Sequence, residues 1–148
     1  MRGPVRQALA CLHRVLYRFV RNHYGIELHV ETSIGRRVRI AHQSGIVISR
    51  YASIGDDCLI RQGVTIGAPS EKRWREAPSL GRGVEVGSGA AILGSISVGD
   101  GAHIGAHAVV LTNVPPGASV FVPSARVFQL PTQFREDSGS GLRGNETA

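Results

Sequence analysis

The sequence predicts an all-β protein, a triangular parallel β-helix in which three six-residue repeats make each coil. Two registers between Leu80 and Pro115 indicate this fold. An aliphatic residue opens six consecutive hexads: Leu80, Val86, Ile92, Val98, Ile104 and Val110. A small or branched apolar residue fills the fifth place of each: Val84, Ala90, Ile96, Ala102, Ala108 and Val114. Neither a helical nor a strand period fits a strict six, so the repeat dictates the architecture.

Each hexad is expected to form a short strand followed by a tight turn, so that three hexads close a coil of eighteen residues. The opening aliphatic side chains then stack inside a prism, and the fifth-place residues point inward near the corners. Gly follows the opening residue in four of the six hexads and tolerates turn conformations that a Cβ would oppose. As in any solenoid, each coil buries its faces only against its neighbours.

The composition fits one narrow prism. The chain has 148 residues, about one domain, with 42% hydrophobic and only 5% aromatic residues. Its two cysteines, Cys11 and Cys58, do not make a disulfide framework, and Cys58 falls on a fifth place, where we expect a core residue. The sequence has no apolar stretch of membrane-spanning length and no signal-peptide pattern, so a cytoplasmic soluble protein is expected.

Positive charge is concentrated near the start of the chain. The first forty residues contain only two acids, Glu27 and Glu31, and eight arginines: Arg2, Arg6, Arg14, Arg18, Arg21, Arg36, Arg37 and Arg39. That excess equals the net charge of the whole chain, +6. It indicates a solvated face, a subunit contact, or an acidic partner such as a phosphorylated ligand or an anionic membrane. Nucleic acid is not expected, because no groove-binding motif or aromatic platform accompanies the arginines.

Residues 1–24 predict a basic amphipathic helix. Apolar residues recur there at three- and four-residue spacing: Val5, Leu9, Leu12, Leu16, Phe19 and Val20. Pro4 suits the first turn and Gly25 is expected to end the helix. The other face carries four of the arginines. Two alternatives remain open: the helix packs against the prism or a neighbouring subunit, or it lies on a membrane surface.

The coils begin at Ile34 and Ile40, and the register then jumps by two residues before Ile48. His42 lies inside this irregular hexad. Hexads at Ile54, Ile60 and Ile66 follow, after which Leu80 comes fourteen residues later instead of the twelve of two hexads. Residues 67–79 therefore predict a polar loop that bulges from the prism, and such excursions from a solenoid commonly carry function.

The β-helix is expected to extend over residues 25–130. Its last segment, Ala118 to Leu130, is apolar enough to cap or cross the prism. Residues 131–148 lack apolar anchors and are predicted to be disordered.

The segment from about Gly25 to Arg126 resembles the hexapeptide-repeat acyltransferases, and within them the serine acetyltransferase branch. The resemblance rests on IELHVETSIGRRVRIAHQSGIV, ASIGDDCLIRQGVTIG, VEVGSGAAILGSISVGDGAHIGAHAVVLTNVPPG and VPSAR. It implies a left-handed β-helix and a homotrimer, with acetyl-CoA bound in the groove between two prisms. It also implies transfer of the acetyl group to a hydroxyl.

His42 matches the family's catalytic histidine. A hydroxyl is a poor nucleophile at neutral pH, so a base must take its proton, and histidine titrates in the useful range. The alternative for His42 is an ordinary corner histidine. The family's orienting Asp corresponds to Glu27, and His29 is a candidate to border the site. Backbone N–H groups at the coil corners are expected to stabilise the developing negative charge.

For acetyl-CoA, the resemblance points to Gly87, Ser88, Gly105 and Ala106, small residues beside which the pantetheine arm could run. Repeat geometry alone is the alternative explanation for them. Arg126, in VPSAR, corresponds to a position that could meet a CoA phosphate. No His, Cys or Asp cluster has metal-ligand spacing, so no metal is expected.

Departures from the family bear on the acceptor. The Asp that precedes the family's catalytic histidine is Ala41 here, and the family's Arg-His pair is replaced by Glu76 and Ala77. A pocket without these partners should bind serine poorly. Because short relatives are often tied to saccharide modification, we predict an O-acetyltransferase acting on a sugar or similar hydroxyl. The alternatives are a serine acetyltransferase that uses Arg73, Arg75 and Glu76 in altered substrate-binding roles, and a non-catalytic scaffold.

Overall fold

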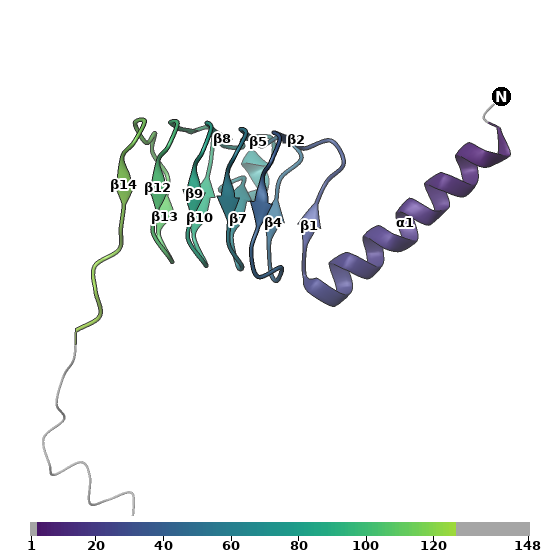
Figure 1. Ribbon diagram of the computed structural model, residues 1–148, viewed down its shortest axis with the longest axis horizontal. Coiled ribbons are helices and arrows are strands. Elements are labelled where there is room, and N and C mark those ends of the chain that lie inside the picture. Colours follow the sequence, from purple (N-terminus) through teal and green to yellow (C-terminus); the bar gives the residue numbers. More distant parts are fainter. Residues whose placement is uncertain (1–2, 127–148) are drawn as a thin grey trace, which may run out of the picture.

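The computed structural model describes residues 3–126, which form one helix and a prism of parallel strands (Figure 1). Helix α1 (Pro4–Tyr24) comes first. Sheet A contains β1 (Glu27–Leu28), β4 (Val47–Ile48), β7 (Thr65–Gly67), β10 (Ala91–Leu93) and β13 (Val109–Val110). Sheet B contains β2 (Ser33–Ile34), β5 (Ser53–Ile54), β8 (Ser79–Leu80) and β11 (Ser97–Val98). Sheet C contains β3 (Arg39–Ile40), β6 (Leu59–Ile60), β9 (Glu85–Val86), β12 (His103–Ile104) and β14 (Ser119–Val120).

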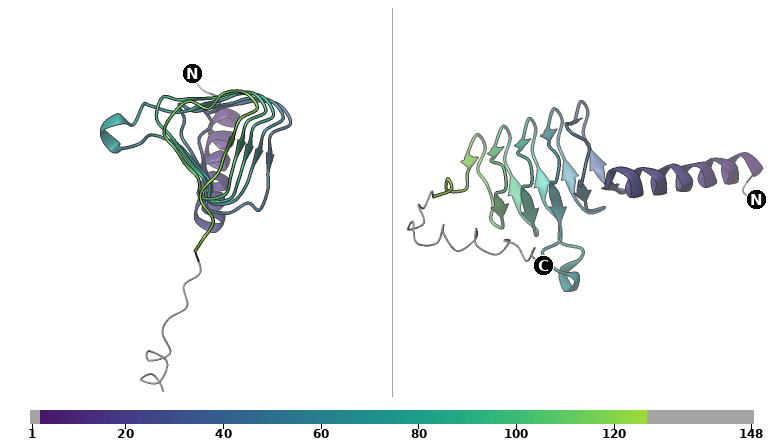
Figure 2. Two further views of the ribbon diagram at one scale, coloured as in Figure 1. Left: turned by 90° about the vertical axis from the view of Figure 1, so that its left-hand side faces the viewer. Right: turned by 90° about the horizontal axis from the view of Figure 1, so that it is seen from below.

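From β1 to β12 the chain visits sheets A, B and C in turn, so each coil adds one strand to each face of a triangle (Figure 2). Between β13 and β14 it meets sheet B only at the isolated bridge of Val114 with Val98. The predicted inward registers are confirmed, since the opening residues from Ile48 to Val110 are at most 4% exposed. The thiol of Cys58 is fully buried, and this burial raises its pKa. Ile34 of the first coil is 40% exposed, because no further coil covers that end of the prism.

The loop after β7 is longer than the sequence spacing indicated. Ile66 and Leu80 lie in neighbouring sheets of one coil, where six residues would suffice. The expectation of two hexads between them was therefore wrong, and eight additional residues enter the loop. This excursion holds a short 3₁₀ helix, η1 (Glu71–Arg73), and projects from one corner of the triangle (Figure 2).

Helix α1 begins and ends as its sequence predicts. Pro4 occupies its first turn, and Gly25 takes a left-handed conformation (φ 62°) while its N–H donates to the carbonyl of Arg21. No residue of α1 is buried, and the helix extends away from the end of the prism (Figure 1). Within residues 3–126, no helix is both long enough and apolar enough to cross a membrane.

The far end of the prism is covered only in part. Ala118 and Val120 pack against the last coil, whereas Phe121 is 68% exposed. The remainder of the expected capping segment after Arg126, and the disorder predicted for residues 131–148, lie outside the described residues.

Candidate active site

His42 belongs to a two-residue insertion at the corner between sheets C and A. The N–H of Ala41 donates to the carbonyl of Ile60 (2.9 Å), as in a regular coil. Three residues later, the carbonyl of Ser44 accepts the N–H of Gly63 (2.9 Å). Residues 41 and 44 thus stand beside consecutive residues, 61 and 62, of the next coil. The two residues that shift the hexad register are therefore His42 and Gln43.

The insertion turns His42 outward. Its backbone has φ 55°, in the left-handed region that non-glycine residues seldom adopt, and its side chain is exposed. Such a conformation costs on the order of 1–3 kcal/mol and persists only where the surrounding structure enforces it. Here the ladder hydrogen bonds on both sides of the corner do so. An imidazole in this place can reach a molecule lying along the outside of the prism.

Four of the predicted cofactor-binding residues, Gly87, Ser88, Gly105 and Ala106, share the corner of His42. Ladder hydrogen bonds of 2.7–3.1 Å set one residue of each coil above the next, giving the column Ala41, Arg61, Gly87, Gly105 and Phe121. Adjacent strands lie about 4.8 Å apart, so Gly87 is about 10 Å from Ala41 along the prism axis. Ser88 and Ala106 follow directly in the same two coils.

These residues line one groove. A cavity of about 330 Å³ is bordered by Arg61, Glu85, Val86, Gly87, Ser88, His103, Ile104, Gly105 and Ala106. The structure therefore brings all four predicted small residues together. The groove and His42 lie on one edge of the prism, at different heights.

Coil stacking itself requires glycine in this groove. A Cβ on Gly87 would lie 2.5 Å from the backbone nitrogen of Ala106, and one on Gly105 would lie 2.9 Å from the ring of Phe121. Repeat geometry thus accounts for both glycines. The same absence of side chains leaves backbone as the floor of the groove, and backbone can approach and hydrogen-bond an extended ligand.

Three further residues that line the groove were not predicted from the sequence as ligand contacts: Arg61, Glu85 and His103. Nδ1 of His103 lies 3.3 Å from Oε2 of Glu85 across neighbouring strands. Beside Arg61, the buried Oε1 atom of Gln62 has no hydrogen-bond partner among the described residues. Hexad alignment could have identified Arg61, because it follows its opening aliphatic residue just as Gly87 does.

Glu27 pairs with His29 and not with His42. Its Oε1 atom lies 3.4 Å from Nε2 of His29, two residues further along the chain. The backbone N–H of Glu27 donates to the carbonyl of Ile46 (2.8 Å), which holds β1 against β4. His29 therefore contacts the predicted orienting carboxylate directly.

The loop residues predicted to bind the acceptor contact one another. Nε of Arg73 donates to Oε1 of Glu76 (2.7 Å), and a second hydrogen bond makes the pair bidentate. These bonds hold the pKa of the Glu76 carboxyl below its usual range. The guanidinium of Arg75 stacks 4.8 Å above the Trp74 ring, whose other neighbour is Tyr51, 5.4 Å away. The loop is thus ordered by its own side chains.

Within a single chain, this loop lies at a different corner of the prism from His42. The loop leaves the corner between sheets A and B, whereas His42 stands between sheets C and A. Arg73 and Glu76 border a separate cavity of about 360 Å³, together with Leu93 and Leu111. The predicted base and the predicted acceptor-binding residues therefore occupy different corners of the triangle.

Two other predictions concern Arg126 and metals. Arg126 is exposed at the end of the described chain and lines neither of these two cavities. Among residues 3–126, no three His, Cys, Asp or Glu side chains lie close enough to form a metal-binding group.

Known proteins match this prism in sequence and structure. Residues 77–112 match the family described as bacterial transferase hexapeptide (six repeats). A serine acetyltransferase of Helicobacter pylori is 42% identical over 106 residues, which are 72% of this chain and 62% of that protein. Serine acetyltransferase isoform 3 of Entamoeba histolytica, solved with cysteine, superimposes with a TM-score of 0.72 at 32% identity, covering 85% of this chain and 45% of that one. The serine acetyltransferase of Vibrio cholerae superimposes with a TM-score of 0.70 at 37% identity, and the match covers 79% of this chain and 45% of that one.

The chain is therefore a hexapeptide-repeat protein. Along its prism it is a relative of the serine acetyltransferases, which confirms the resemblance noted in the sequence and the left-handed β-helix that it implies. The chain spans 62% of the Helicobacter pylori protein and about half of the next relatives, between 45% and 50%.

Proposed function

We propose that this protein is an acetyl-CoA-dependent O-acetyltransferase in which His42 is the general base. The observation that carries the proposal is the shared edge: His42 is turned outward directly after Ala41, whose column forms the groove at Gly87 and Gly105. Relatives of the prism named as serine acetyltransferases support the reaction class.

The groove suits an extended thioester donor. Acetyl-CoA, when bound, supplies an activated acetyl group. The backbone along Gly87 and Gly105 would hold its pantetheine arm, and the guanidinium of Arg61 would attract its phosphates. The imidazole of His42 would accept the proton of the acceptor hydroxyl as that oxygen attacks, a role that requires hydrogen-bond reach. Backbone N–H groups at the corner would stabilise the negative charge that develops on the carbonyl oxygen. The C–S bond of the thioester would then break, and the proton held by His42 would pass to the departing thiolate, so that free CoA and the acetyl ester are the products.

A homotrimer would complete the site. His42 and the Arg73–Glu76 loop stand at different corners of one prism, so a neighbouring copy is needed to place such a loop opposite His42. Two exposed apolar residues lie at the outward side of sheet A: Val109 in β13 is 64% exposed, and Leu111, directly after β13, is 58% exposed. An apolar face of this kind suits a subunit contact.

Serine is the first candidate acceptor, because the relatives compared above are serine acetyltransferases. The saccharide acceptor predicted from the sequence has no support in those comparisons. One observation keeps it as the second candidate: Glu76 engages Arg73, the cation that would otherwise be free for the carboxylate of an amino acid. Ala41 likewise offers no carboxylate to an amino group.

The test is release of free CoA from acetyl-CoA, with serine and a panel of sugars measured in parallel. We expect His42→Ala to lose about 10²- to 10⁴-fold in turnover, the usual contribution of a general base. Gln43→Ala, a substitution in the same insertion, is the matched control and should stay near wild type. Activity of His42→Ala equal to that of the control would refute His42 as base. Failure of the wild type to bind acetyl-CoA would favour a non-catalytic scaffold.

A further inference from the structure

Helix α1 exposes a continuous apolar face. Its 21 residues include no buried side chain. The exposed fractions are 72% for Val5, 60% for Leu9, 54% for Leu12, 58% for Val15 and 53% for Phe19. Single exposed apolar residues are ordinary on a protein surface, but a contiguous stripe along about four turns marks an interaction site.

The opposite face of α1 is entirely basic in its charge. It carries Arg6, Arg14, Arg18 and Arg21, and the helix contains no Asp or Glu. Arg14 makes only a local hydrogen bond from its Nε to the carbonyl of Ala10 (3.2 Å). Because no carboxylate of α1 can pair with these cations, they would complement a negatively charged surface outside the helix.

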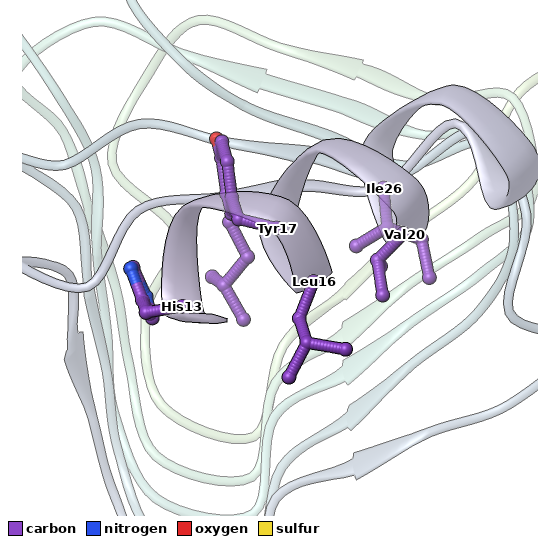
Figure 3. Close-up of a pocket in the computed structure, with 6 residues that line it drawn as sticks. His13, Leu16, Tyr17, Val20 and Ile26 are labelled. Carbon is purple, nitrogen blue, oxygen red and sulfur yellow. The ribbon is translucent and has the colours of Figure 1, made fainter. Parts of the chain in front are cut away.

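The prism occupies only one side of the helix. Between the C-terminal half of α1 and strand β1 lies an apolar cavity of about 260 Å³ (Figure 3). His13, Leu16, Tyr17, Val20, Ile26 and Leu28 line it. At one helical turn per 3.6 residues, Val5, Leu12 and Phe19 lie on the other side of the apolar stripe, away from His13 and Tyr17. Contact with the prism thus leaves most of the apolar face free.

We propose that α1 docks on an anionic membrane surface. Its apolar face would enter the boundary between headgroups and acyl chains, while its arginines attract the lipid phosphates. A helix with a wide apolar face, a basic polar face and low overall hydropathy has the properties of an interfacial helix. Because α1 cannot span a bilayer, it would lie in the plane of the surface. This proposal is independent of acetyl transfer.

A second copy of the helix suits the face less well. The spacing of Val5, Leu9, Leu12, Leu16 and Phe19 alternates four and three, as in a coiled coil. The helix, however, is only three heptads long, and Val15 widens the stripe beyond the narrow seam of a coiled coil. It also has no acidic residue that could pair with an arginine of a neighbouring helix, so parallel copies would repel one another.

The test is flotation of the whole chain with phosphatidylcholine vesicles that contain about 30% phosphatidylglycerol, compared with phosphatidylcholine alone. We expect binding to the anionic vesicles, weakened by salt. Arg14→Gln/Arg18→Gln/Arg21→Gln should lower the affinity about fivefold for each arginine, on the order of 100-fold in all. Leu9→Gln/Leu12→Gln should lower it as well. Both sets lie on exposed positions, and thermal unfolding of the prism checks that the variants fold.

The matched control is Arg36→Gln/Arg39→Gln/Arg82→Gln, which removes the same charge from exposed positions of the prism and should float nearly as well as wild type. An equal loss of vesicle affinity in the control and in the α1 arginine variant would overturn the proposal, because the effect would then come from the net charge of the protein. Absence of wild-type flotation, or equal flotation with neutral vesicles, would also overturn it. A smaller particle mass in solution for Leu9→Gln/Leu12→Gln, without wild-type vesicle binding, would assign the face to a second copy.

Discussion

The Oε1 atom of Glu27 lies 3.4 Å from Nε2 of His29, so the carboxylate expected to orient the catalytic base is held by a different histidine. A carboxylate has two oxygens and can accept from two partners at once. His29 contacts Oε1, which leaves Oε2 for a second donor, and we predict that this donor is His42. Glu27 would then be a positioning residue anchored by His29.

This arrangement predicts an effect on turnover. If Glu27 orients the imidazole of His42, Glu27→Gln should reduce kcat by less than His42→Ala does and leave KM for acetyl-CoA unchanged, because it removes the orienting carboxylate and keeps the base. Glu31→Gln, the control, removes an exposed carboxylate of the same segment that pairs with Arg50, and it should keep the kcat of the wild type. A kcat for Glu27→Gln equal to that of the control would contradict the positioning role.

Arg61 provides a second prediction. It is the cation in the groove beside Gly87 and Gly105, so Arg61→Ala should raise KM for acetyl-CoA and leave KM for the acceptor unchanged. Loss of one hydrogen bond to a charged group corresponds to about a tenfold effect, ~1.4 kcal/mol. Steady-state kinetics with each substrate varied in turn would measure it.

Arg39→Ala is the control for Arg61. Arg39 is an exposed arginine of β3 in sheet C and, unlike Arg61, does not line the groove. Equal effects of the two substitutions on KM for acetyl-CoA would mean that general charge attraction, and not a contact in the groove, is responsible.

The regular part of the fold could be predicted from the sequence because prism packing leaves few choices. Aliphatic residues fill the positions represented by Ile60 and Ile92, and small or branched apolar ones fit near the corners, as Ala90 and Val84 show. The insertions that interrupt the repeat were harder to predict. The spacing from Ile66 to Leu80 gives a residue count but not the sheet in which the chain returns, so the size of the insertion was misjudged.

The sequence predicted individual residues of the candidate site, but not how their side chains pair or which corner of the prism each occupies. The repeat register places Gly87 and Gly105 in one column, but side-chain pairings such as Glu27 with His29 depend on rotamers that no period encodes. Arg73 and His42 occupy different corners because the two insertions fall in different turns of the coil. The linear sequence does not indicate that separation until the hexads are assigned to sheets.

The acceptor loop supports a third prediction, a gain of function. The family resemblance noted in the sequence implies an Arg-His pair at the positions of Glu76 and Ala77, and in this chain Glu76 pairs with Arg73. Glu76→Arg/Ala77→His should release Arg73 and add a donor for the carboxylate of serine. If serine is the acceptor, kcat/KM for serine should rise at least about tenfold, the value of one charged hydrogen bond.

Glu71→Arg is the matched control for this variant. It makes the same charge change in the exposed η1 turn, without touching the Arg73–Glu76 pair. A rise in serine turnover with Glu71→Arg as well would point to a long-range charge effect. A fall with Glu76→Arg/Ala77→His, accompanied by a loss of sugar-dependent turnover, would instead favour a saccharide acceptor.

The ion pair that ties the first two coils together supports a prediction about acid stability. Nη2 of Arg37 donates to Oδ2 of Asp57 (2.8 Å), and this contact holds the pKa of the Asp57 carboxyl below its ordinary value of 3.8. A carboxyl whose folded pKa is depressed contributes stability above its unfolded pKa and loses it as pH falls through the folded pKa. The contribution should therefore be complete above pH 3.8 and disappear below it.

Thermal unfolding of wild type and Asp57→Asn between about pH 6 and about pH 2.5 would measure this dependence. We expect the wild type to melt higher at the upper end, and the difference to shrink as the pH falls below 3.8. Glu71→Gln, which removes an exposed carboxylate of η1, should show no comparable convergence. A difference between wild type and Asp57→Asn that stays constant across the range would mean that the asparagine perturbs the corner backbone. The Arg37–Asp57 charge pair would then contribute nothing to holding the first coil on the second.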